Sequence, residues 1–246
     1  MRTFKSFLAM LLLLSGIAAT AQTKTVDHFT KVIVSPYIQV TFVEGDEESV
    51  TINNITVDES KLHLEVNSQT LRIYLEGAKD FPKYEKDRSS GYDESHPLYQ
   101  NTSVVVTVTY KTLTDLSLRG EEEQLCKSVI DAAKFTLKIY GESEVTFNEL
   151  NAAELETTIY GEASLNIKAG TVTDQQYTCY GEGRINSMSI TGKTRRVIAY
   201  GEADVKLNVS DKIKITAYGD ARLHYKGDPA IVKGIHFGDM LIDKMD

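Results

Sequence analysis

The sequence is poor in cysteine, proline and tryptophan. Its 246 residues include no tryptophan, four prolines and two cysteines. Two cysteines cannot form a multi-bridge disulfide framework, and the low proline count suits a chain of paired strands. Acidic residues outnumber lysine and arginine by 35 to 27, for a formal net charge of −8. This balance disfavours binding to nucleic acid or to anionic membranes.

The first 21 residues have the features of a secretory signal peptide. Arg2 and Lys5 precede an apolar run from 7 to 17, and residues 19–21 (Ala-Thr-Ala) form a small-residue cleavage site. No cysteine directly follows the run, so a lipid anchor is not expected there. No later stretch is long and apolar enough for a membrane-spanning helix. The sequence therefore predicts an exported protein, in the periplasm or at the cell surface.

A short motif, tyrosine-glycine-acid, recurs five times in the second half of the chain. Its tyrosines are 20, 20, 20 and 18 residues apart: Tyr140, Tyr160, Tyr180, Tyr200 and Tyr218. Degenerate copies at 119–121 and 237–239 extend the series to seven. A fixed period near 20 residues is typical of a solenoid, in which each repeat forms one coil.

Each repeat also alternates apolar and polar residues. Phe135, Leu137 and Ile139 alternate with polar residues before the tyrosine, and Val145 and Phe147 do so after the glycine. Alternation with a period of two predicts strands that bury one face. We expect two strands of about 4–6 residues and two turns in each repeat. The predicted fold is all-β, a parallel β-helix with coils of about 20 residues.

The predicted corners have their own pattern. Glycine follows every tyrosine, and it tolerates positive φ and close backbone packing. Two residues further on, we expect a small side chain to point into each corner: Ser143, Ala163, Gly183, Ala203 and Ala221. Cys179 falls in a buried strand column, and Cys126 lies more than two coils upstream. Coils about 4.8 Å apart place the two beyond the ~7 Å Cα separation of a disulfide, which predicts two buried free thiols.

Residues 22–115 precede the repeats and are expected to continue or cap the β-helix. Alternating runs predict strands at 30–34, 37–42, 49–52, 61–66, 70–75 and 103–110. A polar insertion at 77–101 interrupts this pattern and contains four aromatic residues: Phe81, Tyr84, Tyr92 and Tyr99. A loop of this length is usually functional or disordered. Two interpretations stay open, a ligand-contacting loop and a mobile insertion.

Two stretches at either end of the chain carry a family resemblance. Residues 29–52 and 223–229, with 71–73, 104–110 and 116–118 between them, resemble the head GIN domain family, exported proteins common in Bacteroidetes and described as autotransporter adhesins. The family repeat is built on Gly-Ser-Gly, whereas an acid replaces the serine here and serine, alanine or glycine occupies the last position. The resemblance implies a right-handed parallel β-helix similar in outline to pectin lyases, an adhesive role and no established catalytic residues.

The repeats place seven carboxylates in one predicted column: Glu121, Glu142, Glu162, Glu182, Glu202, Asp220 and Asp239. Neighbouring charges about 5 Å apart repel by about 1 kcal/mol in bulk water and about 3 kcal/mol at an effective dielectric of 20. Three interpretations stay open. The side chains point into solvent, they bind calcium, which prefers oxygen ligands, or they hold or act on a glycan. Cleavage of a glycan would need a base, for which Arg184, Arg195 and Arg196 are the nearby candidates.

The tyrosine column has a structural and a functional interpretation. Stacked rings would gain about 0.5–1.5 kcal/mol per pair, and a flat aromatic strip would also suit sugar rings. Arg119 occupies the tyrosine position of the first coil, and we expect it to lie over Tyr140 as a cation–π cap. The five histidines show no metal-ligand spacing, so no metal site is predicted apart from the calcium alternative.

Repeats, export and resemblance together favour a non-catalytic, adhesin-like binding module at the cell envelope, with its repeat domain at 116–246. The candidate ligand-binding residues are the five tyrosines and the acids of the main run: Glu142, Glu162, Glu182, Glu202 and Asp220. The expected partner is a glycan or a host or cell-surface protein, and the expected cofactor is none unless calcium binds. The alternatives are a carbohydrate-active β-helix protein and a purely structural envelope component. A cleft that combines acids with a base would favour the first alternative.

Overall fold

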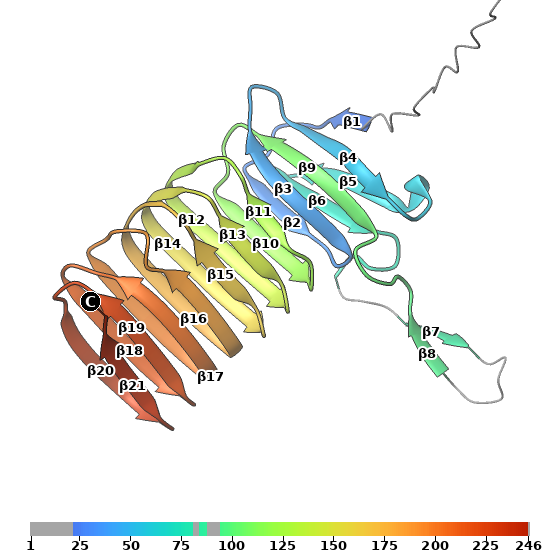
Figure 1. The fold of residues 1–246 in the computed structure, drawn as a ribbon. Helices are drawn as coiled ribbons and strands as arrows, with labels where there is room; N and C mark the ends of the chain where they lie inside the picture. Colours follow the sequence, from blue (N-terminus) through green and yellow to red (C-terminus); the bar gives the residue numbers. More distant parts are fainter. Residues whose placement is uncertain (1–21, 81–83, 88–93, 246) are drawn as a thin grey trace, which may run out of the picture.

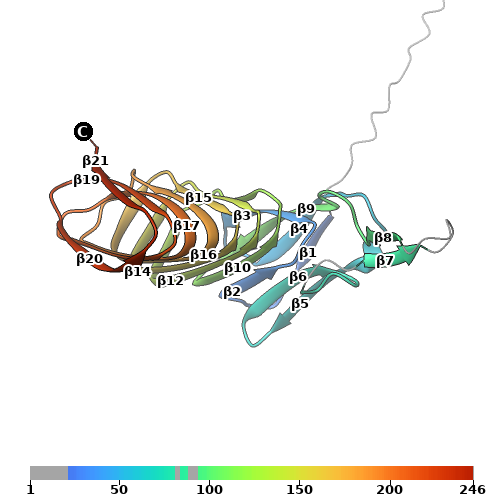
Figure 2. The ribbon, with the colours of Figure 1, turned by 90° about the horizontal axis from the view of Figure 1, so that it is seen from below.

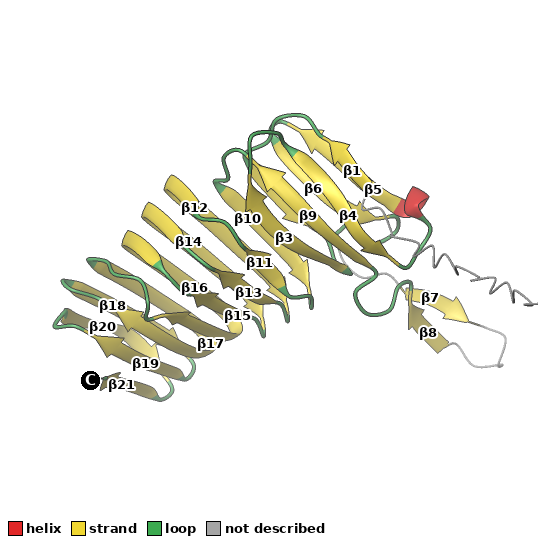
Figure 3. Ribbon diagram, turned by 45° about the horizontal axis from the view of Figure 1, so that its top comes forward, coloured by secondary structure: helices red, strands yellow, loops and turns green. Residues whose placement is uncertain are grey.

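The computed structural model describes residues 22–80, 84–87 and 94–245, which form an elongated β-solenoid of about six turns (Figure 1). Strands make up most of this part of the chain, with one short 3₁₀ helix, η1 (Glu59–Lys61), beside the N-terminal strands (Figure 3). No helix among the described residues is long and apolar enough to cross a membrane. The predicted signal peptide and two aromatic residues of the insertion, Phe81 and Tyr92, lie outside the described residues.

Each coil of the repeat region has two limbs. The first limbs are β10 (Asp115–Gly120), β12 (Ile130–Gly141), β14 (Leu150–Gly161), β18 (Lys212–Tyr218) and β20 (Ala230–Phe237). The second limbs are β11 (Gln124–Cys126), β13 (Glu144–Phe147), β15 (Ser164–Ile167), β19 (Ala221–Lys226) and β21 (Met240–Lys244). Two strands, β16 (Gly170–Ser187) and β17 (Thr194–Asn208), run through the corner and supply both limbs. Equivalent limbs of successive coils pair in parallel, which confirms the predicted parallel β-helix.

The expected strand length of about 4–6 residues holds for β10, which has 6, and is wrong for β12 and β14. Both β12 and β14 contain 12 residues, because parallel pairing continues through 130–134, where the in–out alternation of side chains is interrupted. The second limbs are short, as predicted, with 4 residues in β13 and β15. The limbs of the β12 and β14 coils are therefore unequal, whereas β18 and β19 are nearly equal, with 7 and 6 residues.

The apolar columns meet inside the coils. Figure 2 shows the repeat coils as loops around a common interior. Phe135 and Phe147, from the two limbs of one coil, are fully buried and pack edge to face with ring centroids 5.7 Å apart. Cys126 and Cys179 are both buried and free, as the repeat register predicted.

The corners depend on glycine for two reasons. Gly141 has a φ of 105°, and a Cβ placed on it would lie 2.3 Å from the carbonyl oxygen of Gly120 in the previous coil. A residue with a side chain would therefore meet both an unfavourable backbone conformation and a steric clash. The small residues two positions later point inward and are buried, among them Ser143 and Ala163 at 0% exposure. Both features of the predicted corner are confirmed.

The N-terminal segment both continues and caps the solenoid. Its strands are β1 (Gln22–Thr25), β2 (Lys31–Val34), β3 (Ile38–Glu44), β4 (Ser49–Ile55), β5 (Leu62–Asn67), β6 (Thr70–Leu75) and β9 (Val104–Tyr110). Strands β2 and β3 pair in parallel with β10 and β11 on one side and with β6 and β9 on the other. Antiparallel strands then close the stack, because β5 pairs with β6, β4 with β9, and β1 with β4.

The insertion contains a small hairpin of its own. Strands β7 (Tyr84–Asp87) and β8 (Glu94–Pro97) pair antiparallel and project from the body of the solenoid (Figure 1). The segments on either side of this hairpin, 77–80 and 97–102, return to the solenoid and contact the region around its first repeat corner.

Candidate functional site

The five repeat tyrosines form one stacked column on the outer face of the first limbs. The strand register places each beside its equivalent in the next coil. Ring centroids of neighbours lie 4.8–5.1 Å apart, and their planes differ by only 2–7°. Four of the rings are 39–42% exposed: Tyr160, Tyr180, Tyr200 and Tyr218. The predicted tyrosine ladder is therefore confirmed as a structural feature.

The stacking decides which part of each ring is available. Within the ladder, nearly parallel rings face one another, so the neighbours cover the ring faces. Ring edges and phenolic hydroxyls are what the column presents to solvent. A sugar ring cannot lie flat on a face that another tyrosine already covers. The ladder is thus a row of edges and hydroxyl groups repeated at the coil spacing, rather than the flat aromatic strip considered from the sequence.

The upstream end of the ladder is covered by an arginine. The Arg119 guanidinium lies over the ring of Tyr140, 5.5 Å from its centroid, which confirms the predicted cation–π contact. Its Nη1 donates to Asp80 Oδ1 at 2.7 Å, and Arg72 contacts the same carboxylate. Hydrogen bonds from Arg72 and then Arg119 lower the pKa of Asp80. These contacts tie the start of the insertion to the ladder, which the sequence did not predict.

The acidic column runs beside the tyrosines, one residue beyond each corner glycine. Glycines of successive coils are paired in register, and Glu182 is paired directly with Glu202. All seven side chains are exposed or half-buried: Glu121, Glu142, Glu162, Glu182, Glu202, Asp220 and Asp239. The structure therefore brings the acids together along one edge of the solenoid and the tyrosines together on the adjoining sheet face.

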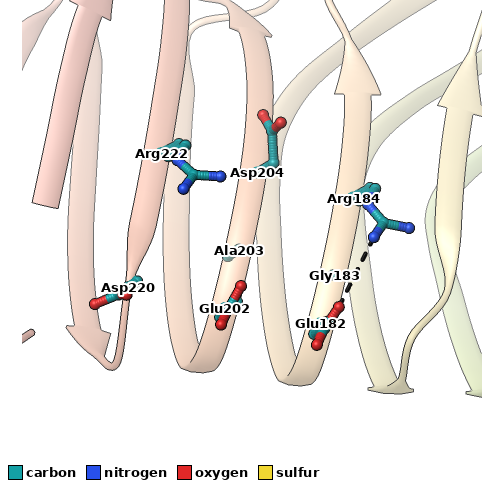
Figure 4. Close-up of a pocket in the computed structure, with 8 residues that line it drawn as sticks. All are labelled: Glu182, Gly183, Arg184, Glu202, Ala203, Asp204, Asp220 and Arg222. Carbon is teal, nitrogen blue, oxygen red and sulfur yellow. Dashed lines mark ion pairs between the residues drawn. The ribbon is translucent and has the colours of Figure 1, made fainter. Parts of the chain in front are cut away.

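A second charged column compensates part of this acidity. Arg184, Asp204 and Arg222 are neighbours in the parallel register, two residues after the acids. Figure 4 shows this alternation of sign above Glu182 and its equivalents. Arg184 Nη2 lies 3.8 Å from Glu182 Oε2. The repulsion expected from the sequence was that of the acidic column alone. Arg184 and Arg222 in the adjacent column weaken this repulsion.

The charged columns surround a shallow depression rather than a cleft. Figure 4 shows the residues that line it. Its volume is about 100 Å³, below the range of about 300–1,000 Å³ found for small-molecule pockets. Among the residues that the structure describes, no three His, Cys, Asp or Glu side chains come together as a metal-binding group. The acidic column thus presents an extended charged edge, and calcium binding by this column stays a prediction.

Arg195, one of the three arginines named above as a possible base, is buried and has a structural role. Arg195 is 2% exposed, and its guanidinium donates to the carbonyl oxygens of Thr194 at 2.9 Å and Asn208 at 3.3 Å. Burial lowers its pKa to about 10. In the same interior, the Tyr177 hydroxyl donates to Gln175 Oε1 at 2.6 Å. This buried polar cluster satisfies backbone carbonyls inside the solenoid and is separated from the acidic edge.

Comparisons with known proteins agree on family and fold. A family model described as "putative auto-transporter adhesin, head GIN domain" matches residues 28–229. A crystal structure of a putative adhesin from Bacteroides fragilis is similar, with a TM-score of 0.70 and 17% identity over 92% of this chain and 96% of that one. A putative adhesin from Parabacteroides merdae gives a TM-score of 0.61 and 16% identity over 92% and 96% of the two chains.

A further similar structure has a different printed description. It is a putative lipid binding protein from Parabacteroides distasonis, with a TM-score of 0.58 and 18% identity over 93% of this chain and 98% of that one. No curated protein sequence matches the chain. At these identities the solved structures establish the shared fold, while the family assignment comes from the family model.

Proposed function

The chain belongs to the head GIN domain family of auto-transporter adhesins, and from that premise we propose that it is a non-catalytic binding module exported to the cell envelope or surface. Its contact surface is the tyrosine ladder together with the acidic column. The partner is a glycan or a protein at a cell surface. The signal-peptide pattern at 1–21 supports export, and the negative charge disfavours nucleic acid as the partner.

The exposed tyrosine ladder is the observation that carries this proposal. A monomeric protein rarely leaves large rings in a contiguous exposed row, yet four ladder tyrosines are 39–42% exposed. Stacking fixes each ring, so little side-chain entropy is lost when a partner binds. Tyrosine also combines an apolar body with a hydroxyl that donates or accepts hydrogen bonds. A partner with repeated polar groups, such as an extended glycan, suits this row.

A hydroxyl-deletion experiment tests the proposal. The purified protein is screened on a glycan array and against intact cells, and any hit is titrated by calorimetry. The triple variant Tyr160→Phe, Tyr180→Phe, Tyr200→Phe keeps the ring stack and removes the hydroxyls, so we expect a loss of at least tenfold in affinity. The matched control is Thr158→Val with Thr178→Val, which removes two hydroxyls from the same limbs two residues before the ladder. Binding that survives the tyrosine changes would contradict the ladder as the contact surface.

The alternatives receive less support from the geometry. A carbohydrate-cleaving enzyme would need a free base in a cleft beside the acids, whereas Arg195 is buried and Arg184, although exposed, lies 3.8 Å from Glu182 beside a depression of only about 100 Å³. Incubation with acidic and neutral polysaccharides, followed by a reducing-end assay, would reveal cleavage. A purely structural envelope role predicts that neither glycans nor cells bind the protein and that the triple variant behaves as the wild type.

A further inference from the structure

The downstream end of the solenoid is a sheet edge. Strands β20 and β21 pair on one side with β18 and β19, and no described strand pairs with their other side. A sheet edge offers backbone N–H and C=O groups to a further strand. At the upstream end, antiparallel strands cover the parallel stack, so a further coil cannot be added there in parallel. The two ends therefore differ in what they can bind.

The side chains of the last coil are more apolar and less covered than those of the coils before it. Among the described residues, it holds every exposed large apolar side chain outside the ladder: Val232, Ile235, Phe237, Leu241 and Met245. Its inward residues Met240 and Ile242 are only half-buried. Their partners in the preceding coil, Ala221 and Leu223, are buried. The core of the solenoid thus ends half covered, as if one more layer of strands were expected.

The charge of the last coil suits a partner of the same kind. Residues 230–245 contain two lysines and two aspartates, whereas the whole chain has a formal net charge of −8. One of these lysines, Lys244, forms an ion pair with Asp228 of the preceding coil. A strongly basic partner would be attracted to the acidic column elsewhere, but this coil gives it no excess of carboxylates. A neutral, apolar edge is instead complementary to a second neutral, apolar edge.

The two strands of the coil are not equally able to pair. Strand β20 has a register shift between the partners of Ile215 and Ala217, and Lys233 occupies the inward position beside the buried Ile215. Bulges and inward charges hinder the pairing of an edge strand. Strand β21 pairs with β19 in one continuous register over all five of its residues. Its edge is therefore the one that a further strand can extend.

The sequence of β21 restricts how it can pair with a second copy of itself. A two-fold axis normal to the sheet makes the pairing antiparallel and keeps inward residues opposite inward residues. An axis at Asp243 would place two Asp243 side chains opposite each other, and an axis at Leu241 would oppose Asp239 to Asp243. An axis at Ile242 opposes Ile242 to its own counterpart and brings no like charges directly opposite each other.

We propose that the last coil is a docking surface for a second copy of this chain, with β21 antiparallel to its counterpart about a two-fold axis at Ile242. The two limbs of a coil face each other across a common interior (Figure 2), so the same axis crosses β20. Ile242 lies four residues after Gly238, and Ile235 lies three before it. Ile235 therefore comes close to the axis, where it would contact its counterpart.

This assembly closes at two copies. The contact uses the same surface of both chains, as a two-fold interface requires, and the covered upstream ends stay outside it. An axis normal to the sheets also leaves both tyrosine ladders on the same side of the dimer. If the ladder is the contact surface, which rests on the proposed function, the dimer would bind a repetitive surface through two ladders at once, with a gain in avidity.

Sedimentation velocity over a range of concentrations tests the dimer. The contact is small, so we expect a dissociation constant of about 10 μM, with twice the mass of one chain well above that concentration. Ile235→Lys should weaken association at least tenfold, because it places two positive charges near the axis. Ile235 is 63% exposed, so the fold should tolerate the change. The matched control is Ile198→Lys, on the outer face of β17 in a central coil, which should leave the dissociation constant unchanged.

Cysteine cross-linking tests the position of the axis. Both native thiols are buried, so mild oxidation reports on an introduced cysteine. Ile242→Cys should give a covalent dimer, since directly opposite residues lie within the ~7 Å Cα separation of a disulfide. Asp239→Cys is the control: three residues from the axis, its Cα atom would lie about 20 Å from its counterpart. It should stay monomeric under the same oxidation.

Several outcomes would overturn the proposal. A single-chain mass at several hundred micromolar would exclude the dimer, and masses that keep growing with concentration would mean an open assembly through another surface. Equal effects of Ile235→Lys and Ile198→Lys, or no effect of Ile235→Lys, would place the contact elsewhere. Cross-linking of Asp239→Cys but not of Ile242→Cys would reject the axis. Circular dichroism melting checks that each variant is folded. A monomer could still bind through its ladder, so failure here leaves the proposed adhesin-like function to its own test.

Discussion

The two ends of the solenoid are finished in different ways. Upstream, antiparallel strands β1, β4 and β5 cover the stack, and the insertion folds over the first corner. Downstream, β20 and β21 pair only with the preceding coil among the described strands. Among the described residues, the large apolar side chains that are exposed outside the ladder all belong to this last coil: Val232, Ile235, Phe237, Leu241 and Met245. In a parallel stack, each coil leaves an unpaired edge on which a further coil could pair. Antiparallel strands or an added segment are needed to cover that edge.

The largest expected effect separates a corner inside the stack from one at its open end. Gly161→Ala should lower the free energy of unfolding by about 3 kcal/mol or more, because φ is 113° and the new Cβ would lie 2.4 Å from the Gly141 carbonyl oxygen. Gly238→Ala meets a similar contact, 2.7 Å from the Gly219 oxygen, yet should cost only about 1 kcal/mol because a terminal coil can open locally. Urea denaturation measures both, and equal losses would show that the last coil is as rigid as the centre.

The tyrosine ladder allows the same comparison between the centre and the open end of the solenoid, with a smaller expected loss of stability. Tyr180→Ser removes two stacking contacts, at 5.0 and 4.9 Å, and should destabilise the protein by about 1–3 kcal/mol. Phe237→Ser should cost about 0.5 kcal/mol, since Phe237 is 66% exposed and stacks on Tyr218 at 5.9 Å with a 28° tilt. Thermal and urea unfolding of the two variants give the comparison. A larger loss for Phe237→Ser would mean that the downstream end is packed more firmly than its exposure indicates.

The acidic column runs along the whole repeat region. The repulsion between its carboxylates can therefore be tested at residues far from both ends of the solenoid. The triple variant Glu162→Gln, Glu182→Gln, Glu202→Gln should raise the melting temperature at pH 7 by about 1–3 °C, less than the acids alone suggest because Arg184 and Arg222 lie beside them. The gain should shrink in high salt, which screens the repulsion between the carboxylates. Melting is compared with millimolar calcium and with chelator. Calcium stabilisation of the wild type alone would establish a calcium site, and a lower melting temperature of the variant in chelator would contradict the repulsion.

The smallest expected effect belongs to the closed end and depends on pH. The folded pKa of Glu122 is raised, chiefly by burial, so the folded state binds its proton more readily than the unfolded state does. Its charge therefore costs stability above the raised pKa, and this cost disappears as the pH falls through that value towards the ordinary 4.5. The wild type should gain stability relative to Glu122→Gln as the pH is lowered from 7 to about 4.5. Urea unfolding at a series of pH values measures the difference, and a pH-independent difference would contradict the raised pKa.

Much of the solenoid was predictable from the sequence because the repeat period decides which residues of successive coils become neighbours. A period of 20 places Tyr140 beside Tyr160 and Gly141 beside Gly161, so the ladder, the glycine corners and the acidic column all follow from counting residues. The buried thiols of Cys126 and Cys179 follow from the same register. Alternation identified the N-terminal strands, since period-two patterns mark a half-buried strand wherever it pairs.

Contacts between segments that no repeat relates were decided by the tertiary structure alone. Nothing in the spacing brings Asp80 to Arg119, or the insertion at 97–102 to Glu122, because these contacts depend on how a non-repeated loop folds back. The tyrosine faces are covered because the rings lie parallel to one another. This orientation depends on side-chain torsions and not on residue spacing. Arg195 shows the same limit: its position in an inward column was readable, but the carbonyl groups that make its burial tolerable belong to three different parts of the chain, at Val172, Thr194 and Asn208.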